Sequence, residues 1–596
     1  MIVGRPIGSG FSGGWGNQKQ SASKQRRRVP VSVGSFCLVL HGHLPYVLRH
    51  GTWPHGEDWL YEAAAETYLP LLSAIQECDF LNGNPKLTIG LTPVLLEQFI
   101  HDDFERGFER YLIERHERAV SDRREFENTN NLHFAHLAAR WEDFYENLAK
   151  RFSEIGGNIP AAFAALARRG FVEILTSSAT HAYLPLLYED SSVFAQFRGG
   201  VATSARILGF KPEGVWLPEC AYRPPGPWYA PIPWGYTRNR MGSEQFLERE
   251  GLSYFFVENQ LIEHCRSEWV DNAGWQKVDW EEAVKYPNRG WRSVQEPVRV
   301  TSDGSMPGRV TAFARDPEIC EQVWSGDIGY PADGVYLEFH KKFGERRGLR
   351  YWKITGSKLD LGAKEPYYPD DVPGKIYEHV SHFCGRVKQR LHDYHNQTGR
   401  YGVVVASFDA ELFGHWWFEG PQFLRDVLLS LNADPDVDLC TPSEYLENHP
   451  PDKAVALPEG SWGDGGDHRV WVNDRVNWMW DVEYRCETHF GKLTYNLPWR
   501  NRPELRDILE KAARELLLLQ ASDWPFVIAR NQAVDYGIKR FVQHVGRFEC
   551  LTDVAEKIAS APDGLDRLTD LEKFEIRDAE LHDVVFADID LNWWNM

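Results

Sequence analysis

Two acidic residues far apart in the sequence each stand directly after an apolar run that is typical of a buried strand. Glu219 follows GVWLP, and Asp409 follows YGVVVASF. Cleavage of a glycosidic bond requires two carboxyl groups, one that protonates the leaving oxygen and one that acts at the anomeric carbon. When they lie about 5 to 5.5 Å apart, a covalent sugar ester forms and the anomeric configuration is retained. Glu219 and Asp409 are therefore our candidates for such a pair.

Three histidines occupy equivalent positions after two other apolar runs. His41 and His43 follow SFCLVL, and His181 follows FVEILTSSAT. A single histidine at a strand end is more often a satisfied hydrogen-bonding group than a catalytic one. The carboxyl ends of parallel strands, however, converge on one mouth, where barrel folds hold their active sites. Because these histidines and the two acids follow four separate apolar runs, we predict that the imidazoles share a pocket with the two acids.

Glu411 and Glu419 compete with Asp409 because they follow it closely in the sequence. We expect Glu411 to start the helix after the strand, where a carboxylate interacts favourably with the helix dipole. If two carboxyl groups ionised side by side, one pKa would be pushed upward, which is how a carboxyl stays protonated near neutral pH. The helix position explains Glu411 well, so Asp409 is preferred as the acid.

The apolar runs before these residues lack the alternation of a half-buried strand. They resemble strands that are buried on both faces, as in a parallel sheet. Apolar residues recur at helical spacing from Glu57 to Asp79, and the stretch 95–168 is helical with many charged faces. Alternating strands and helices favour an α/β barrel or a doubly wound sheet. The predicted strands are 35–40, 86–91, 171–176, 214–217, 254–258 and 401–407.

The pattern changes at several points along the chain, and these changes predict the domain organisation. One helical stretch is too long for a single crossover and indicates an insertion, and a polar stretch with little periodicity, 263–309, indicates an active-site loop. The prediction is a disordered N-terminal extension at 1–30, a catalytic barrel at 31–95 and 169–474, a helical insertion at 96–168, and a C-terminal helical domain at 475–596.

Composition restricts the partners. The net charge of -20 opposes binding to nucleic acid but does not affect a neutral substrate. The 23 Trp suit stacking against sugars, although a single Trp is more often part of the core. The nine scattered cysteines are typical of reduced thiols in the cytoplasm, and no apolar run approaches the ~18 residues of a membrane span. We expect a cytoplasmic monomer or homodimer that binds no membrane.

Five segments resemble, in order, the sequence regions of glycoside hydrolase family 57: HGHLPY, EILTSSATHAYLP, GVWLPECAYRP, ASFDAELFGHWWFEGPQFL and EGSWGDGGDHRVWVN. The flank RHGTWPHGEDWLYEAAAETYLPLL is similar to that of the 1,4-α-glucan branching enzymes of this family. The segment ASDWPFVIARNQAVDYGIKRF is similar to their helical C-terminal domain. The likeness extends from about residue 34 to about residue 550.

The resemblance implies an α/β fold, an incomplete (β/α)7 barrel with an inserted helical domain and a C-terminal α-helical domain. It assigns the nucleophile to the Glu of WLPEC, Glu219, and the general acid/base to the Asp of FDAELFGHWW, Asp409. It implies no metal and no cofactor. The other implied site residues bind substrate: His41, His43 and His181, the aromatic residues Trp53, Trp59, Trp216, Trp324, Trp416, Trp462 and Trp471, and Asp467 with His468.

The implied reaction cleaves an α-1,4 link and forms an α-1,6 branch, with α-1,4-glucan as both donor and acceptor. Transfer to a sugar instead of water requires exclusion of water and a held acceptor, and the predicted loop is placed for this. Similar enzymes use a loop tyrosine here, but this chain has Val298 at the expected position. The aromatic residues of the loop are Trp269, Trp275, Trp280, Tyr286 and Trp291.

Three alternatives remain at the level of sequence. A hydrolytic α-amylase or a 4-α-glucanotransferase of the same family would use the same two carboxyl groups. A metal-dependent deacetylase or mannosidase on a related barrel would use His41, His43 and Asp409 as metal ligands. A glucan-binding protein with an inactive site is a third reading, which the presence of both candidate acids opposes.

Overall fold

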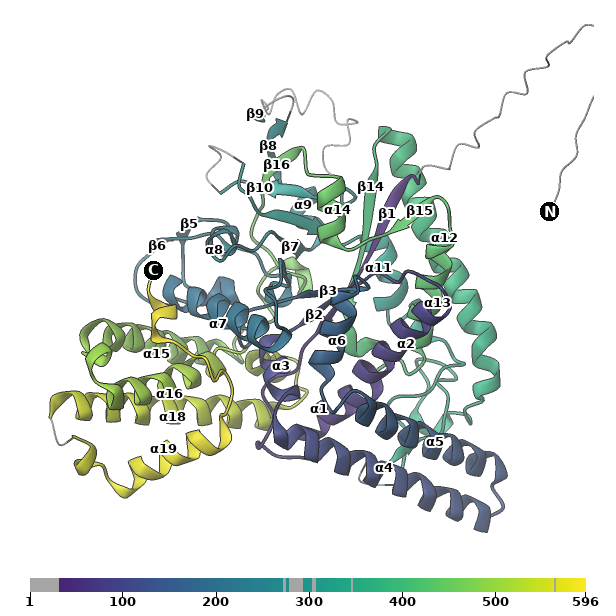
Figure 1. The fold of residues 1–596 in the computed structure, drawn as a ribbon, viewed down its shortest axis with the longest axis horizontal. Helices are drawn as coiled ribbons and strands as arrows, with labels where there is room; N and C mark the ends of the chain where they lie inside the picture. Colours follow the sequence, from purple (N-terminus) through teal and green to yellow (C-terminus); the bar gives the residue numbers. More distant parts are fainter. Residues whose placement is uncertain (1–31, 272–274, 278–292, 303–306, 345–346, 562–563) are drawn as a thin grey trace, which may run out of the picture. The chain divides into compact units, whose positions relative to one another are not determined.

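The computed structural model describes residues 32–596 except 272–274, 278–292, 303–306, 345–346 and 562–563. Its centre is a series of parallel strands in the order β14-β1-β2-β3-β4-β7-β11, in which a parallel bridge from Thr176 to Val215 joins β3 to β4 (Figure 1). In the described residues no strand pairing joins β11 back to β14. The strands are β1 (Gly34–Gly42), β2 (Leu87–Leu91), β3 (Val172–Leu175), β4 (Gly214–Val215), β7 (Tyr254–Val257), β11 (Thr311–Ala314) and β14 (Gly402–Asp409).

This arrangement confirms the predicted incomplete (β/α)7 barrel. All six predicted strands are present, and each residue of β1 and β2 is buried, as expected where helices cover both faces of a sheet. The seventh strand, β11, was not predicted because its four residues, TAFA, are too short to give a pattern. The helices beside the barrel are α1 (Glu57–Ala63), α2 (Leu69–Phe80), α7 (Asp190–Leu208), α8 (Ser243–Arg249), α9 (Asn259–Glu263), α11 (Pro317–Trp324), α12 (Val372–Thr398), α13 (Gly420–Asn432) and α14 (Pro442–Asn448).

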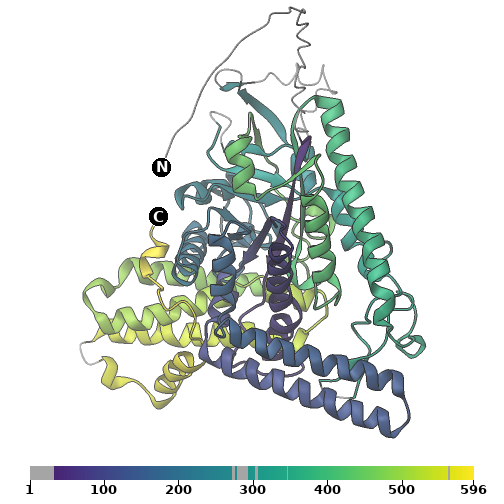
Figure 2. The same cartoon turned by 45° about the vertical axis from the view of Figure 1, so that its right-hand side comes forward.

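The predicted insertion is helical. Its two long helices pack against each other and lie side by side in both views (Figures 1 and 2). Aromatic side chains hold this pair together, since Phe108 of the first helix lies 4.9 Å from Phe152 of the second, between ring centroids. The segment consists of α3 (Pro93–Phe99), α4 (Asp102–Asn128), α5 (Leu132–Glu154) and α6 (Ile159–Arg168).

The C-terminal part is also helical, and one hydrophobic cluster contains buried residues of the barrel, the insertion and these helices. Residues 32–596 form one compact unit, so the predicted borders at 96, 168 and 475 remain predictions. No described helix combines the length and apolar character that a membrane crossing requires. The C-terminal helices are α15 (Asn477–Asn496), α16 (Pro503–Leu519), α17 (Asp523–Ala529), α18 (Val534–Ser560) and α19 (Asp570–His582).

The predicted active-site loop at 263–309 contains strands of a small sheet in its described parts. The described parts of this stretch contain β8 (Arg266–Asp271), β9 (Trp275–Lys277) and β10 (Val298–Val300), and β16 (Lys453–Ala456) pairs with β8 and β10. Val298 is a buried strand residue paired with Ala312. Residues 1–30 and the predicted loop residues Trp280, Tyr286 and Trp291 lie outside the described residues.

Shorter strands complete the described structure. β5 (Gly226–Trp228) pairs with β6 (Arg238–Arg240), and β12 (Lys342–Phe343) pairs with β13 (Leu349–Arg350), both antiparallel. A further strand, β15 (Val437–Leu439), runs parallel to the start of β1. None of these strands extends the barrel order given above.

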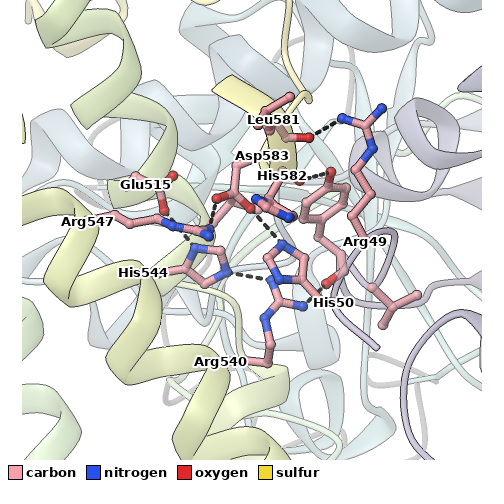
Figure 3. A network of polar contacts seen from close by, with 12 residues as sticks. Arg49, His50, Glu515, Arg540, His544, Arg547, Leu581, His582 and Asp583 are labelled. Carbon is pink, nitrogen blue, oxygen red and sulfur yellow. Dashed lines mark hydrogen bonds and ion pairs between the residues drawn. The ribbon is translucent and has the colours of Figure 1, made fainter. Parts of the chain in front are cut away.

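A buried ionic network joins the C-terminal helices to the segment after β1 (Figure 3). His50 Nε2 lies 2.9 Å from Asp583 Oδ1, and Arg547 pairs with the same carboxylate. On α18, His544 bonds Glu515 at 2.7 Å, and Arg540 donates to the carbonyl of Tyr46 at 2.5 Å. Removal of one partner from a buried ion pair costs about 3–5 kcal/mol. This network therefore holds α17 and α18 beside the strand that carries His41 and His43.

Candidate active site

The two predicted catalytic acids stand at the carboxyl ends of their strands. Asp409 is the last residue of β14 and is paired in register with His41 of β1. Glu219 lies in the short turn Pro218–Cys220 after β4, in a left-handed conformation with φ 59°. His181 has a φ of 58°. Such conformations cost about 1–3 kcal/mol for residues other than glycine and cluster at functional sites.

Trp462 connects the nucleophile candidate to the fifth sequence segment. Its indole Nε1 donates to Glu219 Oε2 at 2.6 Å, and its backbone N–H donates to the carbonyl of Glu219 at 3.1 Å. The Trp462 ring meets Trp216 at 5.1 Å and Trp324 at 6.2 Å between centroids. A donor on a carboxylate favours the ionised form, so Trp462 both orients Glu219 and stabilises its charge.

Both carboxyl groups have raised pKa values. Burial raises the pKa of Glu219 to about 8, against the Trp462 hydrogen bond, and the charge of Asp409 adds to the increase. Burial raises the pKa of Asp409 to about 7, although His43 and Arg315 act in the opposite direction. The two groups therefore interact in one desolvated pocket, as a proton-sharing pair requires.

The three predicted histidines lie together beside these acids. His41 Nε2 lies 3.0 Å from His181 Nε2, and the rings of His43 and His181 stack at 3.9 Å between centroids. His181 Nδ1 is 3.9 Å from Glu219 Oε1. Burial lowers the pKa of His41 and of His181 well below the usual value, with the charge of His43 acting in the same direction. These two imidazoles are therefore neutral at pH 7.

Two residues of the C-terminal helical part complete this cluster. Asp523, the first residue of α17, accepts from His43 Nε2 at 3.0 and 3.1 Å, and the Ser522 hydroxyl lies 2.9 Å from His181 Nδ1. The charge of Asp523 also contributes to the raised pKa of Glu219. The sequence analysis missed both residues because an acid at the start of a helix is common, and ASDWPF marked only a helical similarity.

Arg315 is a further residue that the sequence analysis missed. It follows β11, the strand that was not predicted, and its guanidinium lies 2.9 Å from Glu258 Oε1, at the end of β7. The Arg315 guanidinium lies 5.9 Å from the ring centroid of Trp462 and lowers the pKa of Asp409. Recognition of β11 as a strand would have placed Arg315 at the mouth of the barrel.

The two competing acids have structural partners. Glu411 lies in a single 3-10 turn, Ala410–Leu412, directly after β14, and the following α-helix, α13, begins only at Gly420. Glu411 accepts from the backbone N–H of His43 at 3.1 Å and from the hydroxyl of Tyr68. Glu419 accepts from the backbone N–H of Leu337 and from the hydroxyl of Tyr367. Glu411 thus fixes the loop that carries His43.

Two of the predicted aromatic platforms are core residues. Trp471 is only 1% exposed and packs against Tyr183, and Trp216 is fully buried and stacks on His41 at 4.9 Å between centroids. The prediction that these two rings stack on sugars is wrong, because their faces are already covered by protein. Trp216 supports the imidazole of His41 instead.

The other predicted aromatic residues differ in exposure and position. Trp324 is 39% exposed and contacts Trp462, so it extends the aromatic wall beside Glu219. Trp59 packs against Tyr536 of α18, and Trp53 is half exposed. Trp416 is half exposed and packs against Phe339 at 4.2 Å between centroids. In the described part of the chain, the ring contacts of Trp59 and Trp416 involve neither the acids nor the histidine cluster.

The fifth sequence segment, EGSWGDGGDHRVWVN, contributes polar residues at the edge of the histidine cluster. His468 Nδ1 lies 2.8 Å from the hydroxyl of Tyr183, two residues after His181, and His468 Nε2 lies 2.9 Å from Glu459. Asp467 is exposed and pairs with Arg469 at 2.7 Å. His468 is therefore held beside Tyr183, close to His181, whereas Asp467 forms a local ion pair.

The metal-ligand set of the deacetylase alternative is not assembled. Among the described residues, the ligand atoms that lie within 4.8 Å of one another near the acids belong to His43, His181 and Asp523. This set contains neither His41 nor Asp409, which that alternative requires. His43 and Asp523 also satisfy each other through a direct hydrogen bond.

Comparison with known proteins decides the family. The model of glycosyl hydrolase family 57 matches residues 37–458, and a model described as 1,4-alpha-glucan branching enzyme, C-terminal, matches residues 484–594. The chain belongs to glycosyl hydrolase family 57. The match to this family spans both candidate acids, the three histidines and β11.

Relatives in family 57 cover almost the whole chain. The sequence is 37% identical over 93% of this chain to a 1,4-alpha-glucan branching enzyme of Thermococcus kodakarensis, 78% of which is covered. The crystal structure of a branching enzyme of this family from Pyrococcus horikoshii is similar with TM-score 0.83 and 35% identity, over 94% of this chain and 97% of that chain. The alpha-amylase AmyC of Thermotoga maritima is similar with TM-score 0.76 and 28% identity, over 94% and 99%.

We predict that Trp462→Phe moves the acidic limb of the kcat/KM profile upward by about one pH unit. The change removes the N–H that stabilises the Glu219 carboxylate, so the pKa of Glu219 rises and ionisation requires a higher pH. The matched control is Trp478→Phe, which removes an indole N–H that donates to the Arg475 carbonyl. An unchanged profile for Trp462→Phe would contradict the role of this bond.

For Asp523→Asn we predict a shift of the same limb in the opposite direction. Loss of the negative charge lowers the pKa of Glu219, so the nucleophile ionises at a lower pH. The amide also holds His43 less well, and we expect kcat to fall by about tenfold to a hundredfold. The control is Asp535→Asn, an exposed position on α18. Equal effects of the two variants on the profile would refute a role for Asp523 in the pocket.

Proposed function

We propose that this chain is a retaining 1,4-α-glucan branching enzyme, with Glu219 as nucleophile and Asp409 as general acid/base. The observation that carries the proposal is the pair of interacting, desolvated carboxyl groups at the mouth of a family 57 barrel. The similarity to branching enzymes over more than nine tenths of the chain supports the choice of reaction.

In the first half of the reaction, Glu219 attacks the anomeric carbon of an α-1,4-glucan and forms a glycosyl ester. Asp409 gives its proton to the departing 4-oxygen, so the bond breaks without release of an alkoxide. The raised pKa of Asp409 keeps this proton available near neutral pH. Trp462 donates to Oε2 of Glu219 and leaves Oε1 to face the sugar.

A nucleophile is expected to have a lower pKa than the acid that works with it. In the pocket without substrate the order is reversed, because the pKa of Glu219 is higher than that of Asp409. Interacting carboxyl groups carry their protons as a pair, so the values do not belong to one residue alone. A developing positive charge on the anomeric carbon beside Glu219 favours its ionised form and moves the proton to Asp409. The transition state therefore favours the form of the pair in which Glu219 is ionised and Asp409 is protonated.

In the second half, a 6-hydroxyl of another glucan attacks the ester. Asp409, now a carboxylate, takes the proton of that hydroxyl, and the new α-1,6 bond releases Glu219. His41 and His181 are neutral, buried and hydrogen-bonded to each other, so they support the ring of His43 without adding charge to the pocket. The exposed ring of Trp324 next to Trp462 provides a face for the acceptor and reduces the access of water.

Hydrolysis is the competing outcome, because water can attack the same ester. The similarity to an alpha-amylase with TM-score 0.76 means that the fold alone does not separate the two reactions. The match of residues 484–594 to the C-terminal model of branching enzymes favours transfer. In this structure that part of the chain reaches the pocket through Ser522 and Asp523.

The proposed substrate is a neutral polymer, which fits a chain with net charge -20. We further propose that the enzyme works in the cytoplasm. No disulfide joins the cysteines of the described residues, and most of these cysteines are buried, as is usual for a protein of a reducing compartment.

We predict that incubation with amylose yields new α-1,6 links without a matching rise in reducing ends. The reason is that transfer conserves the number of glycosidic bonds, whereas hydrolysis consumes one per event. Debranching and chain-length profiling of the product measures the new links. Short linear sugars alone would reject branching and favour the hydrolase.

A Glu219→Gln variant is the control for this assay. It removes the nucleophile but keeps an acceptor for the Trp462 N–H. We expect turnover to fall by more than about a thousandfold.

A further inference from the structure

Two connected hollows lie outside the carboxyl pocket, along helix α5 of the insertion. The inner hollow has a volume of about 370 Å³ and is lined by Trp141, Phe144 and Asn147 of α5 together with Phe418. The outer hollow has a volume of about 480 Å³ and lies between α2, α5 and α13. Phe144 and Asn147 line both, so the two hollows form one groove. Each volume is in the range of small-molecule sites.

Aromatic side chains of the loop that follows Asp409 pack beside this groove. The loop after Asp409 holds Trp416, whose backbone N–H donates to the carbonyl of Glu411 at 3.1 Å. Trp416 packs on Phe339 at 4.2 Å between centroids, and Phe418 of the same loop packs on Phe144 at 5.4 Å. A series of rings that begins at Trp416 therefore links the loop that follows Asp409 to the inner hollow, which Phe418 lines.

Arg350 joins the two ends of this series. Its guanidinium lies 5.9 Å from the ring centroid of Phe339 and 5.5 Å from that of Phe418. Its charge is already paired with Glu66 at 2.8 Å. Arg350 is buried and its charge is compensated, so it packs between the rings and offers no free charge to an anionic ligand.

Some polar side chains that line the groove make no hydrogen bond or ion pair within the described part of the protein. In the part of the chain that the structure describes, no hydrogen bond or ion pair involves the side chains of Asn147 or Gln422, which line the outer hollow. Arg140 and Asp143 at the inner hollow are also exposed and without such partners in the described ranges. Amide groups donate and accept at once, as recognition of hydroxyl groups requires.

The charges of the side chains that line the groove indicate which class of ligand it can bind. Basic side chains such as Arg425 and Lys150 are interspersed with acidic ones such as Glu77 and Glu154. Arg425 is paired with Glu77 at 2.6 Å. A polyanion or a strongly charged peptide therefore finds no surface of opposite sign, whereas a neutral, polyhydroxylated chain with apolar ring faces matches both the aromatic and the amide groups.

We propose that this groove is a second binding site for an α-1,4-glucan chain, separate from the catalytic pocket. The inference rests on the proposed function, because it takes glucan as the substrate. A long polymer held in the groove keeps its remaining segments near the mouth, which raises their effective concentration there. Short oligosaccharides cannot reach both places, so the groove acts only on long substrates.

The test compares long and short substrates in variants of the groove. For Asn147→Ala/Gln422→Ala, which removes amides without loss of packing, and for Phe144→Ala, we expect KM for amylose to rise by about tenfold. We expect kcat, and KM for a short maltooligosaccharide, to stay unchanged. The matched control is Tyr377→Ala, which removes an aromatic ring that is 75% exposed on α12.

A binding measurement separates this proposal from the proposed reaction. In a Glu219→Gln background, migration through a gel that contains glycogen is retarded by binding alone. We expect the groove variants to lose most of this retardation, and Tyr377→Ala to keep it. Equal retardation of all variants, or an equal rise in KM for short and long substrates, would contradict the proposal that the groove binds glucan. Failure of branching with retained binding would overturn only the reaction.

Discussion

Two carboxyl groups share one desolvated pocket, and the chemistry of this protein depends on that constraint. Burial disfavours the charge of both Glu219 and Asp409, so the pair holds a proton near neutral pH. The N–H of Trp462 supplies the opposing stabilisation of one carboxylate. Because neutral histidines add no charge to the pocket, the few hydrogen-bond donors to the two carboxyl groups determine which of them carries the proton. The strained turn at Glu219 and the in-register pairing of Asp409 with His41 give these groups fixed positions.

The C-terminal helices are part of the site rather than an appendage. Asp523 and Ser522 orient the ring nitrogens of His43 and His181, and thereby fix which nitrogen carries the proton. The buried ionic network around Asp583 holds these helices against the segment after β1. This arrangement gives a physical reason why one compact unit includes segments that the sequence suggested as separate domains. Displacement of α17 would change the acids and the histidines together.

Local patterns predicted the strands and the two acids that follow them, and the resemblance to family 57 supplied the choice of a barrel over a doubly wound sheet. Unalternating apolar runs identify strands buried on both faces, and polar residues after such strands lie at one mouth. Arg315 was missed because β11 is too short to recognise, and Asp523 because its partner His43 is 480 positions away. Trp471 and Trp216 were misjudged because sequence does not show which rings are covered by protein. Prediction failed where tertiary packing, not local pattern, determines the role of a side chain.

Trapping of the glycosyl ester tests the central claim most directly. An Asp409→Asn variant treated with an α-maltosyl fluoride, whose leaving group needs little protonation, accumulates the intermediate because the amide does not act as a base for its release. Peptide mass spectrometry then locates the sugar. The account predicts a maltosyl adduct on the peptide that contains Glu219. An adduct on another carboxylate, or turnover of the fluoride with inversion and no adduct, would contradict it.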